Sequence, residues 1–183
     1  MTVYLIRHGM TLANERHLYC GSTDLPLSEG GRTALENQPR ISVGDARFLT
    51  SPMLRCRETL AVLFGDVNCE VCPDFREIDF GAFEMHSYEQ LKDDPAYQAW
   101  LDADPERTPP PGGESGEQMK RRVLRALRPV LETDRDTVIV THGGVIAAVM
   151  ESLFPEEGKN RYQWQPKPGR GYAVTGKTYS PIP

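Results

Sequence analysis

The sequence lacks the features that mark membrane, secreted and nucleic-acid-binding proteins. Its net charge is −5 over 183 residues, so bulk charge would repel a nucleic acid. The longest apolar stretch, residues 138–150, is interrupted by His142 and is too short to span a bilayer. No basic region precedes the apolar run at the N-terminus. We therefore expect a cytoplasmic protein with no signal peptide, no membrane partner and no nucleic-acid partner.

Cysteine is scarce and gives no metal-binding pattern. The four cysteines include one C-x-x-C pair, Cys69 and Cys72, but no second pair and no nearby histidine completes a tetrahedral zinc site. We interpret all four as reduced thiols, as is usual in the cytoplasm. The sequence also offers no carboxylate cluster at metal-ligand spacing. We therefore expect neither a metal nor any other cofactor.

What the sequence does contain is an alternation of apolar strands and helices. The apolar fraction of 39% and the charged fraction of 26% are ordinary for a globular protein, and the length favours a single domain over residues 1–183. Strands are expected at 2–7, 47–50, 69–72, 137–141 and 172–175. Helices are expected at 29–37, 52–64, 87–91, 95–101, 116–132 and 145–153. This alternation predicts a three-layer α/β/α sandwich with a mostly parallel central sheet.

Two segments fall outside this alternation. Residues 104–113 contain four prolines and two glycines, which excludes a helix interior or a central strand. This segment is either a surface connection or a flap beside the active site. From about residue 155 the chain forms a C-terminal tail, whose Tyr162, Trp164, Lys167 and Arg170 we expect to pack the tail rather than bind substrate. The long helix carries five basic residues that we interpret as a solvated face: Lys120, Arg121, Arg122, Arg125 and Arg128.

Four of the expected strands lead to chemically useful side chains. The first ends in Arg7 and His8, and the fourth ends in His142. The second runs through Ser51-Pro52 to Arg55, and the third leads to Glu77. Because ligands bind outside the carboxyl ends of parallel strands, these side chains are expected to converge at one edge of the sheet.

The cationic and amide groups of this set suit a phosphate dianion. Arg7 and Arg55 carry planar donor forks that match phosphate oxygens, and the Asn14 amide adds a further donor. Gly143 allows close approach of the backbone, and the helix that follows it offers free N–H groups to an anion. We therefore expect Arg7, Asn14, Arg55 and Gly143 to bind phosphate.

The remaining residues suit phosphoryl transfer through histidine. A histidine attacks phosphorus only when it is neutral, and the adjacent guanidinium charges disfavour protonation of His8. His142 is placed to stabilise charge that develops on the transferring group. Glu77, near Phe75 and Phe80, is the best proton donor to a leaving alkoxide, with Glu84 as a rival.

At this point the motifs resemble those of the histidine phosphatase superfamily, also called the phosphoglycerate mutase-like family. The resemblance covers roughly residues 1–153 and rests on the following segments in order: 7–9, 21 with 23–28, 51–55 with 59, 75–81 with 83–84, 112–115 and 140–144. It implies a phosphohistidine intermediate on His8, with Arg7, Asn14, Arg55 and His142 around the phosphate and Glu77 as acid and then base. It also places Thr23 in the phosphate-binding loop and implies no metal.

The resemblance favours hydrolysis of a small-molecule phosphate ester by a monomer or homodimer. Only a short connection separates Glu77 from His142, whereas mutases of the family carry a longer insertion there. The chain is similar to small phosphatases that act on α-ribazole phosphate and to broad-specificity phosphatases. Phe83-Glu84-Met85 stands where the family often has Trp-Glu-Gly, which leaves the substrate open. The alternatives are mutase-type transfer, a non-catalytic phosphate-binding domain and a protein-phosphohistidine phosphatase.

Overall fold

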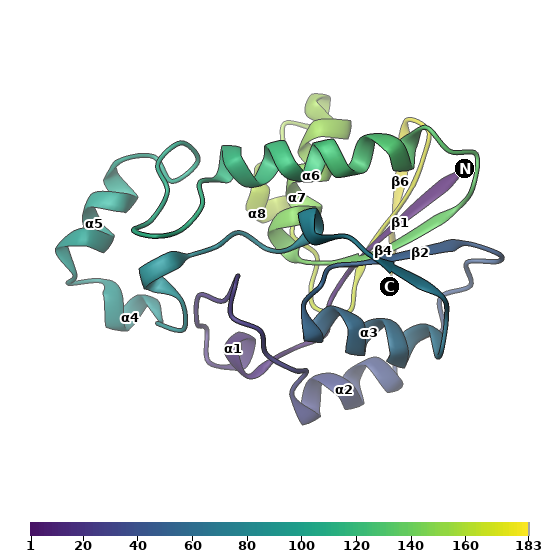
Figure 1. Cartoon of the computed structure of the whole chain (residues 1–183), viewed down its shortest axis with the longest axis horizontal. Coiled ribbons are helices and arrows are strands. Elements are labelled where there is room, and N and C mark those ends of the chain that lie inside the picture. Colours follow the sequence, from purple (N-terminus) through teal and green to yellow (C-terminus); the bar gives the residue numbers. More distant parts are fainter. Residues whose placement is uncertain (183) are drawn as a thin grey trace.

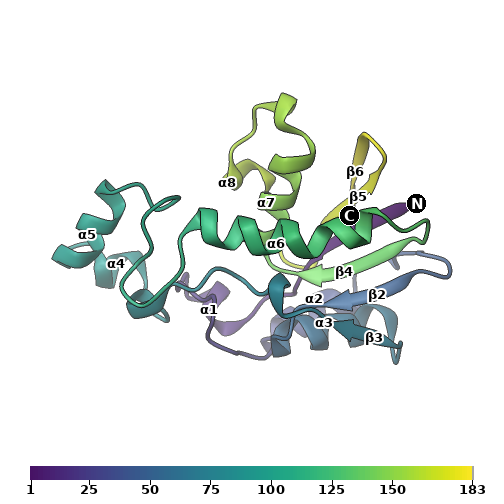
Figure 2. The same ribbon diagram turned by 45° about the horizontal axis from the view of Figure 1, so that its top comes forward.

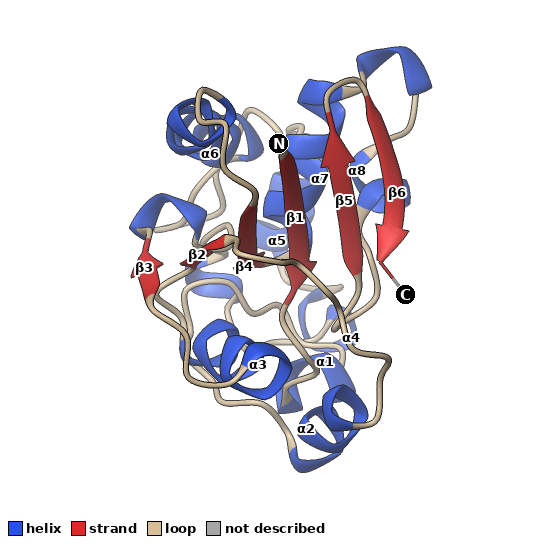
Figure 3. Ribbon diagram, turned by 90° about the vertical axis from the view of Figure 1, so that its right-hand side faces the viewer, coloured by secondary structure: helices blue, strands red, loops and turns tan. Residues whose placement is uncertain are grey.

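A six-stranded sheet runs through the middle of the molecule. The computed structural model describes residues 1–182. The strands are β1 (Thr2–Arg7), β2 (Arg47–Thr50), β3 (Cys69–Val71), β4 (Thr137–Thr141), β5 (Gly171–Thr175) and β6 (Thr178–Ile182). They lie in the order β3-β2-β4-β1-β5-β6. β1, β4, β2 and β3 are parallel, whereas β5 runs opposite to β1 and β6 opposite to β5, as Figure 3 shows.

Residues 1–182 form eight α-helices, and four of them cover the two faces of this sheet (Figure 1). They are α1 (Leu12–Glu15), α2 (Glu29–Glu36), α3 (Leu54–Phe64), α4 (Tyr88–Leu91), α5 (Pro95–Asp102), α6 (Gly116–Leu131), α7 (Gly143–Leu153) and α8 (Arg161–Trp164). Figures 1 and 2 show α6 and α7 on one side of the sheet and α2 and α3 on the other. The predicted three-layer sandwich with a mostly parallel sheet is confirmed.

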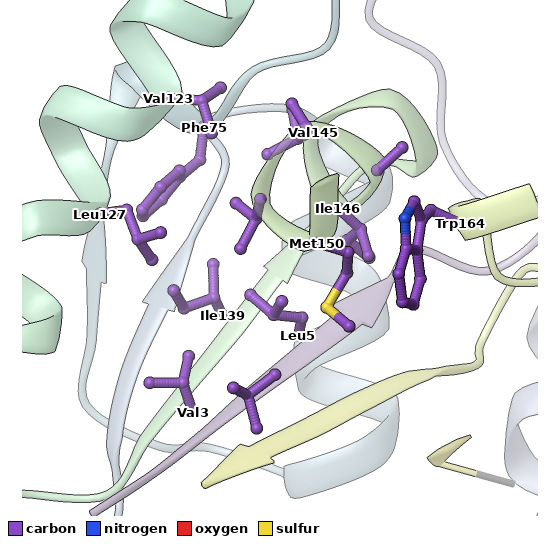
Figure 4. Packing of buried hydrophobic residues seen from close by; sticks show 14 of the residues in the cluster. Val3, Leu5, Phe75, Val123, Leu127, Ile139, Val145, Ile146, Met150 and Trp164 are labelled. Carbon is purple, nitrogen blue, oxygen red and sulfur yellow. The ribbon is translucent and has the colours of Figure 1, made fainter. Parts of the chain in front are cut away.

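Alternation along the strands divides the core into two layers. Val3 and Leu5 of β1 pack with α6 and α7, and Figure 4 shows this cluster around Ile139 and Trp164. Ile6, one position on, packs with α3 on the opposite face. Because side chains alternate across a strand, one short apolar segment supplies both layers.

Helices α4 and α5 lie apart from the sheet, at the far left of Figures 1 and 2. They enclose a third cluster of buried side chains built from Phe83, Leu91, Tyr97 and Trp100. Phe80 packs against both this cluster and the main one. The first part of the connection between Glu77 and β4 is therefore a small aromatic-rich lobe beside the sheet.

Three short elements are missing from the sequence-based assignment. α1 and α8 have four residues each, which is too short for a helical hydrophobic period to show. β6 contains Pro181, which argues against a central strand, but β6 is the outermost strand, where proline is tolerated.

Candidate active site

The loop after β1 holds His8 in one orientation. The His8 N–H donates to the Thr141 carbonyl over 2.9 Å, and the Gly9 N–H donates to Thr59 Oγ1 over 2.9 Å. The His8 Nδ1 and the Gly9 carbonyl oxygen lie 2.7 Å apart. Because a carbonyl only accepts, Nδ1 carries the proton and Nε2 keeps its lone pair. His8 is therefore held with an unprotonated Nε2.

Burial keeps both site histidines neutral. The pKa of His8 lies well below 6.5, first because the ring is buried and then because Arg55 and Arg7 are close. Burial likewise lowers the pKa of His142 well below 6.5, and His8 and Arg55 lower it further. The two rings meet edge to face with centroids 5.1 Å apart. His142 is completely buried, and its Nε2 shares a hydrogen bond of 2.7 Å with Ser51 Oγ.

Arg7 and Asn14 each keep donors available for a ligand. Arg7 Nη1 donates to the Pro166 carbonyl over 2.8 Å, and its buried Nε has no hydrogen-bond partner within residues 1–182. Burial lowers the pKa of Arg7, while Glu77 raises it. Asn14 Oδ1 accepts from both the backbone N–H and the hydroxyl of Thr11, each over 3.0 Å. That arrangement leaves the Asn14 Nδ2 donors free.

The loop of residues 21–23 holds Arg55, and Glu84 holds this loop in place. Its guanidinium donates to the carbonyl oxygens of Thr23 and Gly21 over 2.9 and 2.8 Å, and the residue is 1% exposed. The Glu84 carboxylate accepts from the backbone N–H groups of Gly21, Ser22 and Thr23 and from the Thr23 hydroxyl over 2.7 Å. A Cβ on Gly21 would lie 1.6 Å from a carbonyl oxygen of the acid segment, so only glycine fits.

Glu77 lies against the start of α7. Its Oε2 accepts from the Gly144 N–H over 3.0 Å, and its Oε1 accepts from the Ile78 N–H over 2.9 Å. A Cβ on Gly144 would lie 2.5 Å from Glu77 Oε1, so glycine makes this approach possible. The first N–H groups of a helix have no acceptor inside it, which leaves the Gly143 N–H available to an anion beside Arg7.

Arg122 is buried beneath the acid segment, which corrects the expectation that it belongs to a solvated helix face. It donates to the carbonyl oxygens of Asp74, Arg76 and Glu77 over 2.7, 2.7 and 3.0 Å. Its guanidinium also pairs with the Glu114 carboxylate at 2.6 Å. Positively charged residues on one helix look alike in sequence, and only the packing of α6 separates Arg122 from its exposed neighbours.

A pocket of about 320 Å³ is lined by Arg7, Asn14 and Glu77 of this set. Arg7, Asn14, Glu77 and Gly144 form its polar end. The rest of its wall comes from the following residues: Leu18, Tyr19, Cys20, Ile78, Phe80, Trp100, Leu101, Pro105, Arg161, Tyr162 and Gln165. The same cavity is therefore lined both by polar groups that suit a phosphate and by aromatic and aliphatic side chains.

The two segments left open by the sequence both border this pocket. Pro105 brings the 104–113 segment to its wall, and Tyr162 and Gln165 bring the tail. Trp164 instead packs inward with Phe154, Tyr172 and Tyr179. The expected packing role of the tail is confirmed for Trp164, and Tyr162 borders the pocket.

The structure brings together seven of the eight predicted site residues at one sheet edge: Arg7, His8, Asn14, Arg55, Glu77, His142 and Gly143. Thr23 is adjacent, but its hydroxyl donates to Glu84 and its carbonyl accepts from Arg55. The carboxylate of Glu84, the rival acid, already accepts hydrogen bonds from the loop of residues 21–23. Sequence reasoning gave no role to Arg161 or Gln165, because no local pattern marks them, and it placed Ser51 in the segment 51–55 without its contact to His142.

The described residues contain no grouping of three or more His, Cys, Asp or Glu side chains able to hold a metal ion. Within residues 1–182, no helix has both the length and the apolar character needed to cross a membrane.

The fold and the two strand-end histidines define a histidine phosphatase. The family model of the histidine phosphatase superfamily (branch 1) matches residues 3–175, and the chain belongs to that family. It is an enzyme that acts on small phosphate esters by the histidine mechanism.

Named relatives fall into two groups. The chain is 31% identical to an adenosylcobalamin/alpha-ribazole phosphatase of Salmonella typhimurium, over 95% of this chain and 90% of that protein. It is 28% identical to a probable phosphoglycerate mutase of Salmonella typhi, over 84% and 75%. The solved alpha-ribazole phosphatase of Shigella flexneri superimposes with a TM-score of 0.85 and 26% identity, over 98% of this chain and 94% of that one.

Proposed function

We propose that this enzyme hydrolyses a phosphomonoester whose leaving group contains a ring, with α-ribazole phosphate as the first candidate. One observation carries the proposal: Arg7, Asn14 and Glu77 line the same pocket as Tyr19, Phe80 and Trp100. Aromatic walls stack on flat rings and bury their apolar surface. Two relatives carry the name alpha-ribazole phosphatase, which supports the same choice.

In the first step of the proposed mechanism His8 Nε2 attacks phosphorus. The bond between phosphorus and the leaving oxygen breaks, and protonated Glu77 gives its proton to that oxygen. Arg7, Arg55, Asn14 and the Gly143 N–H bind the equatorial oxygens, and His142 stabilises the charge that grows on them. The product of this step is a phosphohistidine and a free alcohol.

In the second step the Glu77 carboxylate takes a proton from water, and the water oxygen attacks phosphorus. The phosphorus–nitrogen bond breaks, His8 regains its lone pair and Glu77 is again protonated. Each group returns to its starting state, so the cycle needs no metal. We propose that residues 1–183 perform it as one cytoplasmic domain, a monomer or homodimer, with Thr23 positioning Arg55 rather than touching phosphate.

Mutase-type transfer is the second candidate, because one set of relatives carries the name probable phosphoglycerate mutase. A mutase returns the phosphate of phosphohistidine to another hydroxyl of the sugar acid. It would interconvert the positional isomers of phosphoglycerate without net release of phosphate.

The test measures phosphate release in EDTA from α-ribazole phosphate, 3-phosphoglycerate and sugar phosphates, with His8→Ala as the matched inactive variant. We expect the highest kcat/KM for the ring-containing ester and no release by the variant. Isomerisation of phosphoglycerate without release would favour the mutase. Turnover that persists in His8→Ala, or that stops in EDTA, would contradict the mechanism.

A further inference from the structure

Arg161 is the cation in the pocket wall that the catalytic mechanism does not use. It is the first residue of α8, and Gln165 follows one helical turn later. Gln165 Oε1 lies 3.0 Å from the position that a Cβ on Gly143 would take, so Gln165 abuts the phosphate end. Residues four apart on a helix lie about 5–6 Å from each other on one face. Arg161 lines the same pocket as Gln165, together with Trp100 and Pro105.

Glu106 of the 104–113 segment neutralises this cation. Its carboxylate forms an ion pair with the Arg161 guanidinium, and the two side chains are 49% and 22% exposed. The backbone fixes Glu106, because its carbonyl accepts from the Glu117 N–H over 2.8 Å and its N–H donates to Asp104 Oδ1 over 3.1 Å. A Cβ on Gly116 would lie 2.2 Å from Glu106 Oε2, so glycine leaves room for the carboxylate.

We propose that the Glu106–Arg161 pair sets which leaving groups the pocket accepts. Because Glu106 already neutralises Arg161, the guanidinium offers no free positive charge. An uncharged ring can therefore lie against it without a loss of binding free energy. A leaving group with a carboxylate must compete with Glu106 for the guanidinium and is repelled by it. This inference rests on the proposed function and explains how the pocket selects a neutral alcohol over a sugar acid.

The test compares two nearly isosteric esters, glycerol 3-phosphate and 3-phosphoglycerate, which differ by a hydroxymethyl group in place of a carboxylate. Binding is measured by calorimetry at low salt in a His8→Ala background, so that neither ester turns over. In Glu106→Gln the freed Arg161 gains a charge-assisted hydrogen bond to the carboxylate. We expect the affinity ratio of 3-phosphoglycerate to glycerol 3-phosphate to rise about tenfold. In Arg161→Gln the unpaired Glu106 should lower the same ratio.

The matched control is Glu117→Gln, which removes the same charge from the neighbouring exposed pair, Arg107 with Glu117. The affinity ratio of the two esters should stay as in the His8→Ala protein, because Glu117 does not line the pocket. A ratio unchanged in both Glu106→Gln and Arg161→Gln would overturn the inference. Because the readout is binding, that result stays distinct from failure of the proposed function, which is loss of phosphate release in the wild type.

Discussion

At the scale of single residues, two glutamates that look interchangeable in sequence have different surroundings. Glu77 faces the pocket and contacts the start of α7, whereas Glu84 accepts hydrogen bonds from the loop that carries the Arg55 acceptors. An acid helps most when the leaving oxygen is strongly basic. A residue that only positions Arg55 affects all esters alike.

We therefore expect Glu77→Gln to lower kcat on alkyl phosphates at least about a hundredfold while slowing p-nitrophenyl phosphate far less. Glu84→Gln should lower kcat/KM on both ester types by similar factors. The measurement is steady-state kinetics on the two esters with each variant. Equal losses in Glu77→Gln would remove Glu77 from the acid role, and a selective loss in Glu84→Gln would transfer that role to Glu84.

The buried histidines predict a loss of stability in mild acid. The pKa of folded His8 is lowered well below 6.5 by burial, so below pH 6.5 the unfolded chain binds a proton that the folded chain does not. Stability from this group is complete above pH 6.5 and falls as pH decreases. When the pH is lowered from 7.5 to 5.5, the unfolding free energy should fall by about 1 kcal/mol less in His8→Asn than in the wild type. Urea unfolding at both pH values measures this, and equal losses would contradict a neutral His8.

At the scale of elements, α6 ties the acid segment to the sheet through one buried side chain. Arg122 satisfies three carbonyl oxygens and the Glu114 carboxylate. Breaking such a buried pair costs about 3–5 kcal/mol, because the partner charge is left uncompensated. Arg122→Met should therefore lower the unfolding free energy by roughly that amount, whereas Arg121→Met, on the exposed side of α6, should change it by less than about 0.5 kcal/mol. Similar small effects in both variants would show that Arg122 is dispensable.

The sequence predicted the elements whose patterns are local. Buried strands such as β1 and β4 are continuous apolar runs, and the carboxyl-end rule for parallel strands then placed His8 and His142 at one edge. The roles of Arg122 and of the Glu106–Arg161 pair depend on contacts between segments 45 to 55 residues apart. No pattern within a single helix distinguishes such a side chain from a solvated one.

At the scale of the whole molecule, the two tryptophans report on different clusters. Trp100 lies in the α4–α5 lobe and Trp164 in the main core, and Phe80 packs against both. If the chain is one cooperative domain, Trp100→Phe and Trp164→Phe variants should each show a single fluorescence transition in urea. That transition should coincide with the one seen by circular dichroism in the same variant. An earlier transition for the Trp100 signal would mean that the lobe unfolds independently.

The most direct test of the central claim is to trap the intermediate. The enzyme is mixed with a ³²P-labelled phosphomonoester, quenched in alkali, where phosphohistidine survives, and digested for mass spectrometry. A phosphoryl group on the peptide that contains His8, absent in His8→Ala, is the expected result. Hydrolysis of the ester with no label on His8, or with label on another residue, would contradict the phosphohistidine mechanism.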